Sequence, residues 1–206
     1  MIEYISPDEI EKRSFEIIQS ELPRPLDTIL APVIMRVIHT TADFEYVESL
    51  VFSEGVIERA AEALRQGVTI VSDTNMVKAG VDKSRIKAFG GDIQCFMHDE
   101  DVAESARLSG VTRARAAVDK TAAMGSPVIF AIGNAPTALL RICELKEAGI
   151  FSPELVIGVP VGFVNVAESK EVLMRSGIPY ITARGRKGGS NVAAAICNAL
   201  LRIAER

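Results

Sequence analysis

The chain has two histidines, the side chains that most readily transfer protons near neutral pH, and their surroundings differ. His39 lies in the segment RVIHTTADF, close to the expected end of a helix, with Arg36 one helical turn before it. The negative end of the helix dipole favours the protonated imidazole, as bound anionic groups would, whereas Arg36 opposes it. His39 is therefore a candidate general acid, and a histidine that merely ends the helix is the alternative. His98 lies in the acidic segment MHDED, where we expect a surface or structural role.

A second group of functional candidates, all positively charged, lies in the basic segment ARGRKGGSN (183–191), just before an expected helix. It brings Arg184, Arg186 and Lys187 together in an otherwise acidic chain. Guanidinium groups can hold a carboxylate through two hydrogen bonds, so this segment predicts an anion site, with Ser190 and backbone N–H groups in support. A solvated basic turn is the alternative. Neither GxxxxGK[ST] nor GxGxxG occurs, so nucleotide binding has no support.

The segments that carry these residues alternate with short apolar runs. Five such runs are predicted to be buried strands, at residues 68–72, 92–96, 127–132, 155–160 and 179–183. Helical patterns lie between or after them, at residues 102–108, 113–124, 135–148, 166–176 and 191–204. This alternation implies right-handed crossovers and a mostly parallel sheet with helices on both faces. We therefore expect a three-layer α/β/α, doubly wound fold with five strands, from about residue 65 onward.

An open parallel sheet binds ligands in the loops that follow its strands. Here these loops are rich in glycine, proline or amide side chains: SDTNM (72–76), GNAPTAL (133–139), PVGFVN (160–165) and the basic segment. Most of them lead into a helix whose free N–H groups could hold a carboxylate or phosphate. We expect a ligand cleft at this edge, with Asn134 and Thr137 among the ligand-binding residues. Any single loop of this kind is also a common structural turn.

Residues 1–64 show mostly helical patterns, and we expect them to pack on the 65–206 core within one domain. The first predicted helix starts at a capping box, SPDE (6–9), with proline at its first position. Its apolar face is expected to contain Ile10, Ile17 and Ile18. Arg13 borders that face, where it either binds an anion or covers apolar surface with its stem. A second helix is expected from about Pro32, with Val33, Val37 and Ile38 on its apolar face.

The composition limits the classes of partner. A net charge of −4 argues against nucleic acid, although a local basic cluster can still bind a small anion. The 3 cysteines are widely spaced without a CxxC pair, which indicates a reducing compartment and gives no metal site or disulfide framework. The segment MIEYISPDEI lacks the basic start of a signal peptide, and no apolar stretch approaches the ~20 residues that span a bilayer. We expect a soluble cytoplasmic protein that binds neither membrane nor nucleic acid.

Several motifs together resemble those of the precorrin-8X and cobalt-precorrin-8 methylmutases of cobalamin (vitamin B12) biosynthesis. The resemblance extends from EKRSF (11–15) to the last helix and rests on RVIHTTADF, SDTNMVKAGV, AIGNAPTAL, PVGFVNVAESKE and RGRKGGSNVAAAICNALL. GNAPTAL followed by PVGFVNVAESK is specific to this family. The resemblance implies a flavodoxin-like fold, a homodimer and no dissociable cofactor.

The resemblance also implies an isomerase that moves a methyl group from C-11 to C-12 of the corrin macrocycle, giving hydrogenobyrinate or its cobalt form. The family's histidine, which transfers a proton, falls on His39, and its substrate-binding arginines fall on Arg13 and Arg36. One alternative is a tetrapyrrole carrier without catalysis, which would not need a titratable group beside Arg36. Another is a flavin-binding protein, for which a Ser/Thr-rich phosphate loop would be expected after the first strand, and SDTNM resembles such a loop only faintly.

Overall fold

The computed structural model describes residues 6–206, and a six-stranded sheet forms its centre. The strands are β1 (Leu50–Phe52), β2 (Thr69–Ser72), β3 (Asp92–Gln94), β4 (Val128–Ile132), β5 (Leu155–Gly158) and β6 (Tyr180–Ala183). Their order is β1-β6-β5-β4-β2-β3, and all neighbours are parallel except β1, which is antiparallel to β6. Without β1, this is the 2-1-3-4-5 order of flavodoxin-like sheets. The expected doubly wound, mostly parallel fold is therefore confirmed.

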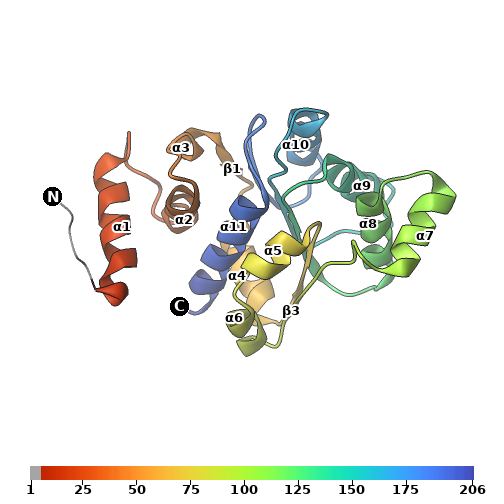
Figure 1. Ribbon diagram of the computed structural model, residues 1–206, viewed down its shortest axis with the longest axis horizontal. Coiled ribbons are helices and arrows are strands. Elements are labelled where there is room, and N and C mark those ends of the chain that lie inside the picture. Colours follow the sequence, from red (N-terminus) through yellow and green to blue (C-terminus); the bar gives the residue numbers. More distant parts are fainter. Residues whose placement is uncertain (1–5) are drawn as a thin grey trace.

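Helices cover both faces of the sheet (Figure 1). They are α1 (Pro7–Glu21), α2 (Ala31–Thr41), α3 (Tyr46–Ser49), α4 (Val56–Arg65), α5 (Asn75–Gly80), α6 (Lys83–Ala88), α7 (Glu100–Ser109), α8 (Arg113–Ala123), α9 (Pro136–Glu147), α10 (Val166–Arg175) and α11 (Ser190–Ala204). Alternate residues of β4 reach the two cores: Ile129 and Ala131 lie in the core of α2, α4 and α11, and Phe130 lies in that of α8, α9 and α10. This alternation explains why the buried strands read as continuous apolar runs. Within residues 6–206, no helix is long and apolar enough to cross a bilayer.

Helix α11 lies between the sheet and α2, and α1 packs against the far side of α2 (Figure 1). Ten residues of α11 are buried, including a run of alanines at 193–195. A helix that is apolar on most of its surface is buried on most of its surface, and the small alanine side chains allow close approach. The expected α2 is confirmed, with Val33, Val37 and Ile38 buried.

The N-terminal region is less purely helical than its sequence predicts, because it contributes β1 to the edge of the sheet. The prediction of five strands was therefore one short. Strand β1 has only three residues, LVF, which directly follow α3. A run this short shows no alternation and cannot be distinguished from the end of a helix by its pattern.

Helix α1 also differs from its prediction at two points. The Ser6 hydroxyl donates to the Glu9 carboxylate at 2.8 Å, and no side chain caps the helix, so the reciprocal capping box does not form. Of the three isoleucines expected on the apolar face, Ile18 is buried, whereas Ile10 and Ile17 are exposed. Because α1 packs on the curved surface of α2 rather than on the sheet, only a narrow stripe of it is covered.

A buried lysine fixes the loop that follows β6. Lys170 on α10 is 1% exposed, and its ammonium donates to the carbonyl oxygens of Gly185 at 3.0 Å and Lys187 at 2.7 Å. These inward-facing carbonyls satisfy a charge that would otherwise be buried without partners. Burial still disfavours the charged form and lowers the pKa of Lys170 from 10.5 to about 8.

Lys170 therefore predicts a pH dependence of stability. Its pKa is about 8 in the folded protein and 10.5 in the unfolded chain. Between these two pH values the unfolded chain keeps a proton that the folded chain has lost, so the folded state gains stability as pH rises. The unfolding free energy of the wild type minus that of K170M should rise between about pH 8 and 10.5. The slope should be at most ~1.4 kcal/mol per pH unit. Denaturant titrations across this range measure the difference, with K83M at an exposed position as the control. A constant or falling difference for K170M would contradict the assignment.

Candidate functional site

A cavity of about 320 Å³ opens between α2 and α11, beside the turn that joins α5 to α6. It is lined by Arg36, His39 and Thr40 of α2, by Gly80, Asp82 and Arg85, and by Asn191, Ala194, Ala195, Asn198 and Arg202 of α11. Asn198 ties the turn to α11, because its amide donates to the Gly80 carbonyl and its oxygen accepts from the Asp82 N–H, both at 2.8 Å. The cavity is thus bounded by elements whose relative positions are fixed.

His39 lies in the last turn of α2 with its side chain exposed, as its sequence position predicts. Its imidazole stacks on the ring of Phe15 from α1, with centroids 5.2 Å apart and an interplanar angle of 21°. The Arg36 guanidinium lies 4.8 Å from the centre of the same ring. Phe15 therefore holds the orientation of both polar side chains through one apolar surface.

The arginines that line the cavity are all paired with carboxylates of the chain. Arg36 donates to Glu11 at 2.6 Å, and Arg202 lies 3.2 Å from the same carboxylate oxygen. The hydrogen bond from Arg36 is the main cause that holds the pKa of Glu11 below its usual value, against an opposing effect of burial. Arg85 pairs with Asp82 at 2.6 Å and with Glu205 at 2.8 Å. The cavity can therefore bind an anion by exchanging one carboxylate for another.

The GNAPTAL loop has its own anion, which the sequence analysis did not anticipate. Asp73, which follows β2, accepts hydrogen bonds from the backbone N–H groups of Gly133, Asn134 and Ala135 at 2.9, 2.8 and 2.6 Å. Burial raises the pKa of Asp73, and these N–H groups oppose that rise. The backbone N–H groups expected to hold a ligand thus already hold a carboxylate.

The side chains of the GNAPTAL loop are placed at the strand ends as expected. Asn134 is exposed there. The hydroxyl of Thr137 lies 2.9 Å from that of Thr112 at the start of α8. Ser190, in the first turn of α11, lies 2.8 Å from the hydroxyl of Thr74. Each of these residues therefore borders the same carboxyl edge of the sheet.

The charged side chains of the basic segment make more contacts within the protein than the sequence indicates. Lys187 pairs with Asp43 at 2.6 Å and Glu45 at 2.7 Å, and the hydrogen bond that it donates to Asp43 is the main reason that the pKa of Lys187 is raised. The Arg186 guanidinium lies 5.4 Å from the centre of the Phe163 ring, which is 81% exposed. Lys187 therefore joins the loop to the N-terminal region, whereas Arg186 faces an exposed apolar side chain.

The structure brings only some of the predicted site residues into one cavity. Within residues 6–206, His39 and Arg36 line it, whereas the other predicted residues lie outside it: Arg13, Asn134, Thr137, Arg186, Lys187 and Ser190. Arg13 on α1 donates to Glu16 at 3.4 Å and is 45% exposed. The sequence analysis missed Arg85 and the polar stripe of α11. The spacing of Asn191, Asn198 and Arg202 at i, i+7 and i+11 within an apolar helix was the available signal.

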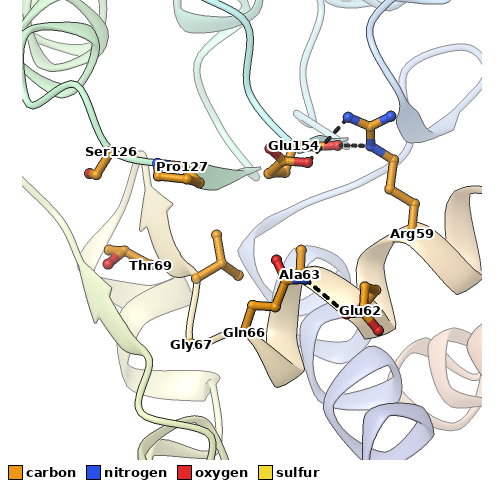
Figure 2. Close-up of a pocket in the computed structure, with 10 residues that line it drawn as sticks. Arg59, Glu62, Ala63, Gln66, Gly67, Thr69, Ser126, Pro127 and Glu154 are labelled. Carbon is orange, nitrogen blue, oxygen red and sulfur yellow. Dashed lines mark hydrogen bonds and ion pairs between the residues drawn. The ribbon is translucent and has the colours of Figure 1, made fainter.

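A second cavity, of about 360 Å³, lies at the edge of the sheet where the parallel strands begin (Figure 2). It is bounded by the starts of β2 and β4 and by α4, and the ion pair of Arg59 with Glu154 at 3.2 Å spans one side. None of the predicted site residues lines it. The cavity at His39 is the candidate site, because it contains two of the predicted residues, His39 and Arg36.

Comparisons with known proteins identify the family of the chain. The family model described as precorrin-8X methylmutase matches residues 9–203. A cobalt-precorrin-8 methylmutase of Priestia megaterium is 45% identical over 202 residues, which cover 98% of this chain and 90% of that protein. A precorrin-8X methylmutase of Pseudomonas aeruginosa is 38% identical over 208 residues, covering 97% and 98%. A crystal structure of a precorrin-8X methylmutase from Thermus thermophilus superposes with a TM-score of 0.88 at 38% identity, covering 96% of this chain and 98% of that one. The chain therefore belongs to the precorrin-8X methylmutase family.

Proposed function

We propose that this protein is the isomerase that moves a methyl group from C-11 to C-12 of precorrin-8X or cobalt-precorrin-8 in cobalamin biosynthesis. The observation that carries the proposal is the cavity in which His39 lies among Arg36, Arg85 and Arg202. The substrate bears acetate and propionate arms, so an acidic protein needs a locally basic cavity to bind it. The family membership supports the same reaction.

The reaction needs proton transfer and positioning rather than a nucleophile. The methyl bond to C-11 breaks and a methyl bond to C-12 forms within the same ring, so no atom or electron is gained or lost. Protonation by His39 would make the conjugated system electron-deficient where the methyl group arrives, and the proton returns when the product forms. The arginines would hold the carboxylate arms and so keep the ring in a shape that favours migration.

A tetrapyrrole carrier is the second candidate, because the same cavity could bind a corrinoid without acting on it. The exposed imidazole beside Arg36 favours the enzyme, since a carrier needs no proton donor there. We also propose a reducing, cytoplasmic location, which is supported by three cysteines that are all free thiols.

Replacing His39 by Ala should nearly abolish methyl migration while leaving product binding measurable, because the proton donor is lost and the arginines remain. Turnover is measured from the visible absorption of the product, with metal-free and cobalt-containing substrates compared. The control is H98A, which removes the other, exposed histidine and should keep wild-type activity. Retention of more than about a tenth of wild-type turnover by H39A would exclude general acid catalysis by His39. Binding without any turnover by the wild type would identify a carrier.

Replacing Arg36 or Arg13 by Ala should weaken product binding by about 1.5–3 kcal/mol each, the size of a charge-assisted hydrogen bond. Arg36 lines the cavity, and Arg13 lies on α1, whose Glu11 pairs with Arg36. Calorimetric titration with the product measures the change. R24A is the control, since Arg24 forms an exposed pair with Glu48 away from the cavity. Unchanged affinity in both R36A and R13A would refute the role of these arginines in binding.

We further propose a homodimer in which residues from both chains bind one macrocycle. The cavity of about 320 Å³ lies at the low end of the ~300–1,000 Å³ typical of ligand sites, and a corrinoid with its arms is a large ligand. Phe163 and Val164, beside Arg186, are 81% and 77% exposed, which is typical of a surface that a partner or ligand covers. A closed two-fold dimer is also the commonest soluble assembly.

Light scattering should give twice the mass of the chain. Mixing the inactive variants H39A and R186A should then restore activity, because a mixed dimer contains one site with neither substitution. Random exchange of chains in a two-fold dimer predicts about a quarter of wild-type activity. The control is the same mixture after covalent crosslinking of each parent dimer, which blocks exchange. No recovery despite demonstrated exchange would confine each site to one chain.

A further inference from the structure

One carboxylate is bound by two arginines at the mouth of the candidate site. Glu11 comes from α1, Arg36 from α2 and Arg202 from the last turns of α11, so the contact joins three helices. The same Glu11 oxygen lies 2.6 Å from Arg36 and 3.2 Å from Arg202, and its second oxygen lies 3.4 Å from Arg202. Both arginines also line the cavity that contains His39. The structure therefore shows one carboxylate held by two of the arginines that line the cavity.

The surroundings of Glu11 allow its carboxylate to separate from the two arginines. The side chain of Glu11 is 44% exposed, and ion pairs at such positions stabilise a fold only slightly. Arg36, by contrast, is 15% exposed and also contacts the Phe15 ring, a contact that does not involve the Glu11 carboxylate. Exchange of Glu11 for another carboxylate would therefore leave the guanidinium groups in place.

The other acidic side chains near the cavity differ from Glu11 in this respect. Asp82 accepts hydrogen bonds from the backbone N–H groups of Ser84 and Arg85 and so caps α6, a role that a ligand could not replace. Glu205 and Asp82 share Arg85, so removing either leaves that arginine paired. Glu11 is thus the carboxylate whose departure creates a free anion site.

We propose that Arg36 and Arg202 form a subsite for one carboxylate arm of the corrinoid, and that Glu11 occupies this subsite until the ligand displaces it. The inference rests on the proposed function and adds Arg202 as a binding residue. Displacement exchanges one carboxylate for another, so the charge of the cavity is unchanged by binding. The movable contact also lies on α1, which carries Phe15 against His39.

The test compares product affinity in E11Q, R202A and the double variant. E11Q removes the competing charge and should bind the product roughly 3–10-fold more tightly, whereas R202A should bind it at least roughly tenfold more weakly. In the R202A background, E11Q should increase affinity by a smaller factor than in the wild type, because Glu11 and the ligand then compete for Arg36 alone. The controls E48Q and R175A remove exposed ion-pair partners elsewhere and should leave affinity unchanged. Circular dichroism melts check that each variant is folded.

Two results would overturn the inference while leaving the proposed function intact. Weaker binding by E11Q would show that Glu11 positions the arginines instead of competing with the ligand. Unchanged binding by R202A, with the expected loss in R36A, would remove Arg202 from the subsite. A wild-type protein that neither binds nor converts a corrinoid would instead refute the proposed function, and the inference with it.

Discussion

The burial of α11 between the sheet and α2 is the constraint on which the site depends. Close packing on both sides requires small or apolar side chains over most of the helix, which accounts for its alanines. Polar residues are tolerated only along the stripe of Asn191, Asn198 and Arg202, and this stripe borders the cavity. The same packing brings the last turn of α2, with His39, beside α11. The requirements of the core thus determine where a polar cavity can exist.

Buried or paired charges hold the loops at the carboxyl edge of the sheet. Asp73 binds three backbone N–H groups of the GNAPTAL loop, and Lys170 binds two carbonyl groups of the basic segment. Lys187 joins that segment to Asp43. The backbone groups that often bind anions in open sheets are therefore used here to fix the loops. We therefore propose that side chains, and above all arginines, bind the carboxylates of the ligand.

Charge balance in the cavity suits a ligand with several carboxylates. The protein as a whole is acidic, yet three arginines line one small cavity, each paired with a carboxylate of the chain. Desolvating unpaired arginines would be unfavourable, so internal carboxylates stabilise the cavity before a ligand arrives. An incoming carboxylate that replaces Glu11 would keep this balance. The ligand would then be selected by the number of its carboxylate arms that bind a guanidinium group.

The sequence by itself determined the parallel strands and the placement of Arg36 and His39 on one face of a helix. Both depend on residues that lie close together within a single strand or helix. Strands β2 and β4 to β6 are long enough to show their apolar character, and residues one turn apart on a helix share a face. Strand β1 was missed because its three residues follow α3 without a turn between them, whereas β3, of the same length, follows two glycines. Only the tertiary structure decided that Arg202 meets Glu11, or that Asp73 occupies the GNAPTAL loop. Those contacts join segments far apart in the chain, and they depend on how helices and strands pack, which local spacing does not specify.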